Sequence, residues 1–512
     1  MAYRGEKLSL GIDLGTSSCK FCAVDPRGRI VGVASSGYPT FSPFSGWAEQ
    51  NPRDWIEAAA SAAAALWESG SVDPRSVERI TLTSAAHIAA PTDADGVPVR
   101  HALLWSDQRS KAEAESLRRA YGEYIMARGY NNVSTSWSLP HLVWVREREP
   151  EVWGKVRMIF LSKDYLLFKL TGERVTDPAT AVSAMLYDGP SMQWSEKLCS
   201  LADIDVRALP AVRPPQEVAG HLTKEGSRIL RLEEGIPVFN GTLDSATETF
   251  GAGAVAPGDL VIRIGTAGGI HIIKETPSPN PRLLTYPFPL NGLWYSQAGT
   301  SSAGSAIAWA VTSEGGAKSP DGFRSFGQKA ARAPAGSLGL LFHPFLSGER
   351  TPYWEPGLRG TFTGASFQHT DAHFARAVLE GVAFSLCDAF AAMMENQPIP
   401  DQVRVVGGGT REPVLLEILS ATLGVRLQAM PQVDSAYGAA LLGLHADGSL
   451  RTRGGEPDGG AASTVFPDQA LSDTYKKMFE KYRIVAGHLL SLYRDISSID
   501  DGHIRGAKVG EV

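Results

Sequence analysis

The stretch that decides the fold is LSLGIDLGTSSCKFCAVD, residues 8–25. Leu8–Asp13 is predicted to form a strand, Gly15 and Thr16 a tight turn, and Cys19–Asp25 a second strand. The next residues, PRGR, form a turn that leads into a third strand-like run, IVGVAS. We therefore expect a β-meander to open the first domain, with no helix between its strands.

A unit of the same design begins at Gly258. GDLVIRIGTAGGIHIIKE (Gly258–Glu275) again predicts a strand, a Gly-Thr turn and a strand. Strand-like runs alternate with helical stretches along most of the chain, which is typical of α/β proteins. Two such meanders, one near the start and one near the middle, favour two halves of a duplicated fold. We expect domains at 1–255 and 256–512, divided within the small-residue segment GAGAVAPGD (Gly251–Asp259).

The composition is that of a globular protein large enough for several domains. The 512 residues are 43% hydrophobic and 20% charged, and the net charge is −6, so no broad basic surface for nucleic acid or anionic lipid is expected. The N-terminal residues show no apolar signal-peptide region. The run AAASAAAALW (Ala58–Trp67) is too short to span a bilayer and instead predicts a helix with Asn51 as N-cap. We expect a cytoplasmic protein that binds neither nucleic acid nor membrane.

Several short patterns of other protein classes have a simpler structural explanation. Cys19 and Cys22 form a CxxC spacing, but both lie in an expected strand and no second CxxC completes a zinc site. His369 and His373 have a metal-pair spacing without an evident third ligand. GAGAVA (251–256) matches GxGxxA but follows a helical stretch, which excludes a dinucleotide fingerprint. Walker A, HRD and DFG motifs are absent from the sequence, which argues against the P-loop and protein-kinase routes.

The first turn has the features of a phosphate site. Gly15, Thr16, Ser17 and Ser18 supply successive backbone N–H groups and hydroxyls, and such a concavity suits phosphate oxygens. Asp13, just before the turn, could hold Mg²⁺, usually through water because Mg²⁺ dehydrates reluctantly. The alternative is an ordinary hairpin turn with a capping aspartate.

Two further glycine-rich turns could contribute to a nucleotide site. The second meander repeats the turn without the acid. A third cluster, RVVGGGTRE (404–412), follows a strand and opens a helix, so that a nucleoside could approach its backbone closely. The alternative for this cluster is a structural turn in the left-handed conformation. The residues concerned are Gly265, Thr266, Ala267, Gly268 and Gly269 in the second turn and Gly407, Gly408, Gly409 and Thr410 in the third.

Asp244 is the candidate general base. It lies in FNGTLDSATETFGAG (239–253), after a short strand and a glycine and before a helical run. Removing the proton of a hydroxyl during phosphoryl transfer needs one carboxylate within hydrogen-bond reach. An N-cap aspartate at a strand-to-helix turn explains the local sequence equally well.

Taken together, these segments resemble the FGGY family of carbohydrate kinases, within the actin/Hsp70-like ATPase superfamily. The likeness runs from about Leu8 to about Gly443, with the motifs in family order. GWAEQNPRDW (46–55) is similar to the family's GWxEQxPxxW segment, and LLWSDQR (103–109) resembles the WxDxR stretch that lines the sugar site. SGERTPYWEPGLRGTFTG (347–364) resembles the signature of the second domain, and SAYGAALLG (435–443) the closing helix.

The resemblance implies two duplicated actin-like (ribonuclease H-like) α/β domains flanking a central cleft, the first for sugar and phosphate and the second for nucleotide. It implies ATP-dependent phosphorylation of a small sugar, with ATP between the Thr16 and Thr266 loops, Mg²⁺ near Asp13, and Asp244 as general base. The implied sugar-binding residues are Ala86, His87, Trp105, Asp107, Asp244 and Ser245. The implied nucleotide-binding residues are Gly15, Thr16, Ser17, Ser18, Lys20, Gly265, Thr266, Gly268, Gly407, Gly408, Gly409 and Thr410.

Within the family, the xylulokinases look most similar, which favours a pentulose such as D-xylulose. Thr83–Trp105 resembles their segment, but Ser84, Ala85 and Ala86 replace their usual Gly-Gln-Met before His87. Another ketose, a polyol or an aldonate therefore stays open as the substrate. The resemblance also allows a homodimer.

Two alternatives from other classes are weaker. A non-metabolic actin-like ATPase, such as a chaperone or filament protein, would explain the phosphate turns but neither LLWSDQR nor the Asp244 segment. A sugar-binding relative without catalytic activity is disfavoured by the presence of both Asp13 and Asp244.

Overall fold

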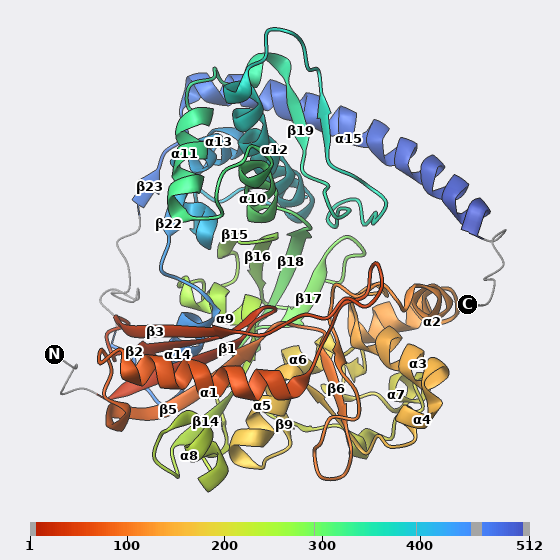
Figure 1. Ribbon diagram of the computed structural model, residues 1–512, viewed down its shortest axis with the longest axis vertical. Coiled ribbons are helices and arrows are strands. Elements are labelled where there is room, and N and C mark those ends of the chain that lie inside the picture. Colours follow the sequence, from red (N-terminus) through yellow and green to blue (C-terminus); the bar gives the residue numbers. More distant parts are fainter. Residues whose placement is uncertain (1–6, 291, 396, 452–462, 505–512) are drawn as a thin grey trace. The chain divides into compact units, whose positions relative to one another are not determined.

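The computed structural model describes residues 7–290, 292–395, 397–451 and 463–504, and the chain forms two compact units (Figure 1). Unit 1 comprises residues 1–257, 273–296 and 433–461, and unit 2 comprises residues 258–272, 297–432 and 462–512. The first crossing between units, at Pro257, lies in the predicted linker, beside the predicted boundary at residue 255. Two later segments return to unit 1, which the sequence did not predict.

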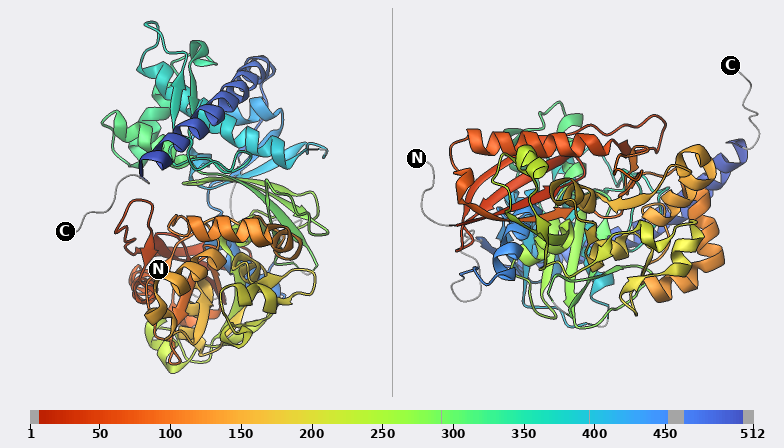
Figure 2. Two further views of the ribbon diagram at one scale, coloured as in Figure 1. Left: turned by 90° about the vertical axis from the view of Figure 1, so that its right-hand side faces the viewer. Right: turned by 90° about the horizontal axis from the view of Figure 1, so that it is seen from below.

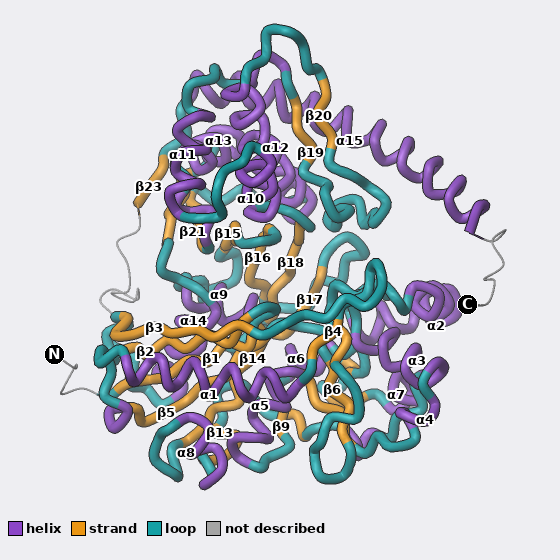
Figure 3. The backbone as a smooth tube through the Cα atoms, in the orientation of Figure 1, coloured by secondary structure: helices purple, strands orange, loops and turns teal. Residues whose placement is uncertain are grey.

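Unit 1 is built on a six-stranded sheet (Figure 3). Its strands are β1 Leu8–Leu14, β2 Ser18–Val24, β3 Ile30–Gly37, β5 Val77–Ser84, β13 Val218–His221 and β14 Pro237–Leu243. They lie in the order β13-β14-β5-β1-β2-β3. The antiparallel pairing of β1 with β2 and of β2 with β3 confirms the predicted meander. Because β5 is parallel to β1 and to β14, these three strands end at the same edge of the sheet.

Helix α1 (Pro52–Glu68) covers one face of this sheet (Figure 2). It begins where the sequence predicted, with the Asn51 side chain accepting a hydrogen bond from the backbone of the second helical residue. Its buried alanines belong to the same apolar core as Leu10 and Ile12 of β1. Alternate residues of β1 therefore point to α1, as expected for a strand with period two.

Helix α14 (Ser435–Ala446) packs directly on the opposite face of β1. A Cβ at Gly11 would lie only 1.9 Å from the Ala436 carbonyl oxygen, so this contact requires glycine. Asp13, two residues after Gly11, lies on the same face of the strand. The fold thus directs Asp13 to the α14 side of the sheet.

Further elements of unit 1 surround this core. The helices are α2 Lys111–Gly129, α3 Ser138–Arg148, α4 Pro150–Trp153, α5 Ser162–Thr171, α6 Pro178–Ser183, α7 Glu196–Leu201, α8 Lys224–Leu230 and α9 Asp244–Gly251. The short pairs are β4 Glu49–Gln50 with β7 Ala102–Leu103, β6 Ala89–Thr92 with β8 Met158–Leu161, β9 Val175–Thr176 with β12 Ala211–Val212, and β10 Tyr187–Asp188 with β11 Gln193–Trp194. The pairing of β4 with β7 joins the GWAEQNPRDW and LLWSDQR motifs.

A seven-stranded sheet forms the core of unit 2. Its strands are β15 Leu260–Ile264, β16 Gly268–Lys274, β17 Leu284–Pro287, β18 Trp294–Thr300, β21 Gln402–Val406, β22 Arg426–Met430 and β23 Ser463–Val465. Their order is β17-β18-β16-β15-β21-β22-β23, and β17 with the adjoining ends of β16 and β18 falls in the 273–296 segment of unit 1. The antiparallel hairpin of β15 and β16 confirms the second predicted meander.

The remaining elements of unit 2 are mainly helical. They are α10 Gly304–Ser313, α11 Pro320–Ala330, α12 Asp371–Met393, α13 Pro413–Leu423 and α15 Gln469–Ile504, with the pair β19 Leu341–His343 and β20 Thr361–Thr363. Each unit is thus a mixed sheet with helices, which confirms the predicted α/β class. In the parts of the chain that the structure describes, no helix combines the length and apolarity needed to cross a bilayer.

Candidate active site

Three predicted site segments of unit 1 meet at one edge of its sheet. Leu14 at the end of β1 and Leu243 at the end of β14 are both in register with Ser84 at the end of β5. The first phosphate turn, the His87 segment and Asp244 follow directly after these strand ends. In open α/β sheets, ligands bind outside the carboxyl ends of the strands. The sheet therefore assembles the predicted phosphate, sugar and base segments.

The first phosphate turn is held by side chains of the GWAEQNPRDW segment and its surroundings. The Gln50 amide donates to the Thr16 carbonyl oxygen at 2.7 Å, and the Tyr38 hydroxyl donates to the Gly15 carbonyl oxygen. Gln50 in turn accepts a hydrogen bond from the indole of the buried Trp55 at 3.0 Å. These bonds fix the backbone of the turn through its carbonyl oxygens.

Asp13 and Lys20 are cross-strand neighbours in the β1–β2 hairpin. The Lys20 ammonium forms an ion pair with Asp434, the N-cap of α14. Burial lowers the pKa of Lys20, but the charge and hydrogen bond of Asp434 outweigh it, so that the pKa is raised and the group stays cationic. The sequence predicted Lys20 as a nucleotide contact but not this carboxylate, which lies 414 residues away in the chain.

The residues around Asp13 fit a magnesium ion carried by a nucleotide. Asp13 Oδ2 lies against the turn, 3.7 Å from where a Cβ of Gly15 would stand. Mg²⁺ typically keeps several waters and takes one or two carboxylates plus phosphate oxygens. A single carboxylate beside a phosphate turn matches that requirement.

Trp105 links the predicted sugar segment to this turn. Its indole N–H donates to Thr16 Oγ1 at 3.3 Å, and its side chain is only partly buried. Ala86, one residue before His87, is likewise partly exposed. Thr16 and Ala86 each lie two residues after the paired strand ends Leu14 and Ser84, and Trp105 bonds Thr16, so the three residues lie in one part of unit 1.

Asp107 has a different environment from the one predicted. Its side chain is fully buried, its carboxylate binds the Arg109 guanidinium at 2.8–3.0 Å, and one oxygen accepts from Ala48 N at 2.6 Å. Arg109 also bonds Glu49 at 2.9 Å and lies 3.7 Å above the Trp47 ring. These bonds join the two motifs through the carboxylate, and a contact between Asp107 and a sugar stays a prediction.

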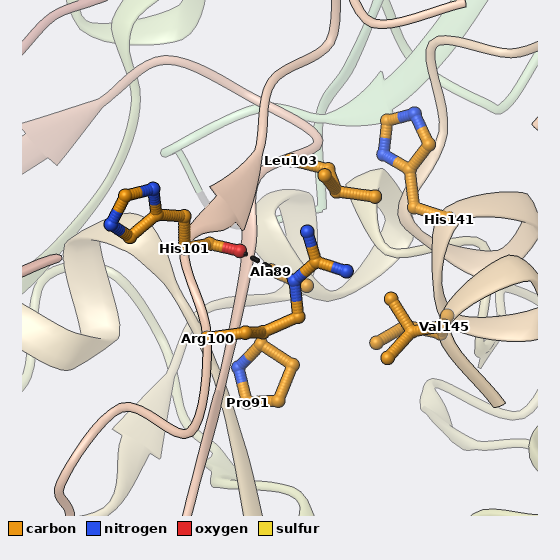
Figure 4. A pocket seen from close by; sticks show the side chains of 8 residues that line it. Ala89, Pro91, Arg100, His101, Leu103, His141 and Val145 are labelled. Atoms are coloured by element: carbon orange, nitrogen blue, oxygen red, sulfur yellow. Dashed lines mark hydrogen bonds between the residues drawn. The ribbon is translucent and has the colours of Figure 1, made fainter. Parts of the chain in front are cut away.

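A small cavity lies near the contact between these two motifs (Figure 4). Its volume of about 10 Å³ suits a single water molecule and is too small for a sugar. Within it, Arg100 Nε donates to the His101 carbonyl oxygen at 2.8 Å, and burial lowers the pKa of His141 to about 4. The cavity is therefore part of the structural core. It is lined by Ala89, Pro91, Arg100, His101, Leu103, His141, Leu142 and Val145.

His87 is held on several sides. Its backbone has a left-handed φ of 68°, which is uncommon for a residue other than glycine. Nδ1 lies 2.9 Å from the Ser136 carbonyl oxygen, and Nε2 lies 2.7 Å from the Tyr286 hydroxyl. The ring stacks on Trp137 with a centroid distance of 4.1 Å. Sequence reasoning found His87 but missed Trp137 and Tyr286, because no local motif marks them.

Asp244 is the first residue of helix α9, with Leu243 as the N-cap. The alternative that Asp244 is the N-cap is therefore wrong. Its Oδ1 accepts a hydrogen bond from Ser245 N at 2.7 Å, and the Ser245 hydroxyl lies 2.9 Å from the Tyr295 hydroxyl. The strand before it approaches β5 so closely that a Cβ at Gly241, whose φ is +67°, would clash with the β5 backbone. Asp244 is thus carried by a tightly packed strand end.

A buried ionic cluster lies beneath this strand. The Lys163 ammonium bonds both the side-chain and backbone oxygens of Asn240 at 3.0 Å, and pairs with Asp164 at 2.9 Å and Asp177 at 3.6 Å. Thr242 donates to Asp177 at 2.7 Å. Burial raises the pKa of Asp164, against the opposing effect of Lys163. Breaking such a pair leaves an uncompensated buried charge, so the cluster fixes the strand that leads to Asp244.

The second phosphate turn, in unit 2, is held by backbone groups. Gly304 N donates to the Gly265 carbonyl oxygen at 2.8 Å, while Ala303 N and Ser305 N donate to that of Thr266 at 3.0 and 3.1 Å. These donors lie at the start of helix α10. The second turn is therefore stabilised mainly by a helix N-terminus, with a further hydrogen bond from the Ser305 hydroxyl to the Thr266 carbonyl oxygen at 2.8 Å.

The third glycine cluster lies beside the second turn. Strand β15 is parallel to β21, so the turns that follow them share an edge of the unit 2 sheet. Gly407 has φ +89°, and a Cβ there would lie 2.7 Å from the Ile264 carbonyl oxygen; at Gly409 it would lie 2.2 Å from the Ile264 side chain. Gly408 and Thr410 belong to the short 3₁₀ turn that follows. This close packing explains the glycines structurally and places both predicted nucleotide turns of unit 2 together.

Glu349, within the SGERTPYW segment, supports this region. Its Oε1 accepts from Ser301 N at 2.5 Å and Arg350 N at 2.8 Å, and its Oε2 accepts from the Ser385 hydroxyl at 3.1 Å. Burial raises the pKa of Glu349 to about 7, although these hydrogen bonds oppose the shift. Because Ser301 precedes α10, Glu349 braces the segment that holds the second turn.

The patterns set aside in the sequence are structural. Cys19 and Cys22 are buried, free thiols. His373 Nδ1 closes the capping box of α12 with Thr370, and His369 Nδ1 accepts from Ser366 N at 2.8 Å. Among the described residues, no group of three or more His, Cys, Asp or Glu side chains could hold a metal ion.

Comparison with known proteins identifies the family. Residues 8–251 match the model of the N-terminal domain of the FGGY family of carbohydrate kinases, and residues 260–446 match its C-terminal domain. The xylulose kinase of Lactococcus lactis is 32% identical over 418 residues, 80% of this chain and 81% of the relative. The gluconokinase of Bacillus subtilis is 27% identical over 453 residues, 86% of this chain and 88% of the relative.

Solved structures agree with the sequence comparison. The crystal structure of xylulose kinase from Rhodospirillum rubrum matches with a TM-score of 0.82 and 28% identity, covering 95% of this chain and 100% of that chain.

Proposed function

This chain belongs to the FGGY family of carbohydrate kinases, and we propose that within the family it phosphorylates a pentulose, with D-xylulose as the first choice. As a family member it is an ATP-dependent sugar kinase. The observation that carries the proposal is the meeting of the first phosphate turn, His87 and Asp244 at one sheet edge. Relatives named xylulose kinases support the sugar, while the gluconokinase makes an aldonate the second candidate.

In the proposed mechanism, unit 1 holds the sugar and supplies the base. Trp105, Ala86 and His87 border the sugar, and Asp244 accepts the proton of the reacting hydroxyl. As the hydroxyl oxygen forms its bond to the γ-phosphorus, the bond to the bridging oxygen breaks and ADP leaves with the electron pair. The proton thus passes from the sugar to Asp244, and the phosphoryl group passes from ATP to the sugar.

The phosphate turns supply hydrogen bonds to the nucleotide. In unit 1, the backbone N–H groups of Thr16 and Ser17 and the hydroxyls of residues 16–18 would face phosphate oxygens, whereas Gly15 N already donates to the Ser18 carbonyl oxygen at 3.0 Å. Asp13 would hold the Mg²⁺ that neutralises phosphate charge. In unit 2, the turns at residues 265–268 and 407–410 would offer backbone N–H groups to nucleotide oxygens. Preorganised donors of this kind stabilise the charge that develops during transfer.

The base assignment is tested by Asp244→Asn. The amide keeps the shape but cannot take the proton, so kcat should fall by about 10²–10⁴-fold while the sugar KM changes little. Asp371→Asn is a matched control, because Asp371 is also the first residue of a helix and its Oδ1 also accepts from the next backbone N, at 2.9 Å. We expect the control to retain activity. Wild-type kcat in a folded Asp244→Asn variant would refute the base assignment.

The sugar is tested by coupled ADP release across ketoses, polyols and aldonates. We expect the highest kcat/KM for a pentulose. If glycerol or gluconate is preferred over every pentulose by about 100-fold, or about 2.7 kcal/mol, the pentulose assignment is wrong. ATP turnover that no sugar stimulates would instead favour an actin-like ATPase.

A further inference from the structure

Two buried tyrosines reach the proposed sugar site from a distant part of the sequence. Tyr286 on β17 and Tyr295 on β18 are 1% and 0% exposed. They lie in the 273–296 segment, which belongs to unit 1 although it follows the crossing into unit 2. Their rings stack with a centroid distance of 5.5 Å. The pair therefore forms a rigid aromatic unit within unit 1.

Tyr286 acts on His87. The Ser136 carbonyl, 2.9 Å from His87 Nδ1, can only accept, so Nδ1 carries a hydrogen. In the neutral ring Nε2 is then an acceptor, and the Tyr286 hydroxyl, 2.7 Å away, donates to it. A partner on one ring nitrogen sets the tautomer and orientation of the other. The Ser136 carbonyl thus sets which nitrogen of the His87 ring carries the hydrogen, and Tyr286 holds the opposite edge of the ring in place.

Tyr295 acts on the segment of the proposed base. Its hydroxyl lies 2.9 Å from the Ser245 hydroxyl, and Ser245 N donates to Asp244 Oδ1 at 2.7 Å. Burial raises the pKa of Tyr295, so its hydroxyl stays protonated at any pH at which an enzyme works. The first turn of α9, which carries Asp244, is thereby fixed from the β18 side.

We infer that Tyr286 and Tyr295 are positioning residues of the sugar site, Tyr286 acting through His87 on sugar binding and Tyr295 acting through Ser245 on the placement of Asp244. This inference rests on the proposed function. The two rings stack on each other, so the two tyrosines belong to one packed group. Residues 273–296, in the second half of the sequence, thus contribute to a site whose motifs lie in the first half.

The experiment compares Tyr286→Phe, Tyr295→Phe and a matched control, Tyr437→Phe. Tyr437 is equally buried in unit 1, and its hydroxyl donates to the Gly28 carbonyl oxygen at 2.9 Å. Phenylalanine keeps the ring and removes only the hydroxyl. We expect Tyr286→Phe to raise the sugar KM by about 3- to 10-fold with a smaller change in kcat. Tyr295→Phe should lower kcat by a similar factor.

The ATP KM of Tyr286→Phe and Tyr295→Phe should stay within about twofold of the wild type. Tyr437→Phe should keep the sugar KM, the ATP KM and kcat of the wild type. A general loss of packing would change these three constants together and would not separate the variants. Unchanged sugar KM and kcat, or equal changes in all three variants, would overturn the inference. Melting temperatures of the three variants show whether each is folded.

A double variant separates this inference from the base assignment. If Tyr295 acts through Asp244, Tyr295→Phe should cost almost nothing further in the Asp244→Asn background. The same fall in both backgrounds would overturn the role of Tyr295. The sugar used is whichever the substrate panel ranks first, so a wrong pentulose assignment leaves the tyrosine test intact.

Discussion

The two phosphate turns share a backbone design but carry opposite charges. Each connects the first two strands of a meander whose first strand has a parallel neighbour. Asp13 and Arg263 occupy matching positions, two residues before the turn glycines Gly15 and Gly265. The first turn is one residue longer, because Leu14 pairs with Cys19 while Ile264 pairs with Gly268.

The two turns also differ in what holds them. Side chains of Gln50 and Tyr38 bond the carbonyls of the first turn, whereas backbone N–H groups at the start of α10 bond those of the second. Gly304, which bonds the second turn, has no room for a side chain, since a Cβ there would lie 2.7 Å from the Gly265 carbonyl oxygen. The two turns thus have a similar backbone, while the charge beside them and the hydrogen bonds that hold them differ. We propose that the acidic turn serves the metal and that the second turn serves phosphate alone.

The largest expected effect comes from removing the charge of Asp13 before the first turn, compared with that of Arg263 before the second. Asp13→Asn should lower kcat by about 10- to 100-fold and raise the Mg²⁺ concentration needed for half-maximal rate, because an amide holds the hydrated metal poorly. Sugar affinity should be nearly unchanged. Arg263→Gln, the matched change in the second turn, should leave the Mg²⁺ requirement as in the wild type. Calorimetry that shows lost sugar binding with normal MgATP binding in Asp13→Asn would reverse the assignment.

Glu349, the buried carboxyl group next to the second turn, should make the stability of the folded protein depend on pH. Because the pKa of Glu349 is raised to about 7, the folded state holds the proton more tightly than the unfolded state. Its contribution is greatest below the unfolded pKa and is lost as pH rises from about 4.5 to about 7, by roughly 3 kcal/mol. Glu349→Gln should flatten this part of the profile. If the melting temperatures of the wild type and of Glu349→Gln changed with pH in the same way between pH 5 and pH 8, this prediction would be wrong.

A smaller effect is expected from the difference in packing around the two turns, which a glycine-to-alanine change at each turn would show. Gly304→Ala places a methyl group against backbone and should cost about 1–3 kcal/mol of stability and raise the ATP KM. Gly15→Ala meets the Ser18 carbonyl oxygen at 3.3 Å and Asp13 Oδ2 at 3.7 Å, both longer contacts, and should be milder. Denaturant unfolding and ATP kinetics of both variants provide the measurement. A larger loss in Gly15→Ala would contradict the difference in packing.

The smallest effect concerns the side-chain support of the first turn. Gln50→Ala removes the hydrogen bond to Thr16 and leaves the Trp55 indole without its acceptor, at a cost of about 1 kcal/mol. We expect a few-fold rise in the ATP KM. Ser305→Ala is the counterpart in unit 2: it removes a side-chain bond to the Thr266 carbonyl oxygen, but the backbone bonds remain. It should therefore change the ATP KM less than Gln50→Ala does.

Local sequence signals predicted the elements that carry the site. The meanders, the N-cap at Asn51 and the strand before Asp244 follow from neighbouring residues, and the structure has each of them. The ordered motifs also predicted the family. Tyr286 and Tyr295 were missed because they lie in an ordinary strand hairpin without a motif, and only its return to unit 1 brings them to His87 and Ser245.

By itself, the sequence determined the two Gly-Thr turns, the strands on either side of each turn and the identity of the acids and bases near them. The tertiary structure alone decided which of those groups are available for chemistry. Asp107 is buried against Arg109, and Lys20 is ion-paired with Asp434. The physical reason is that burial and charge pairing depend on segments far apart in the chain, whereas turns and caps depend on a few adjacent residues.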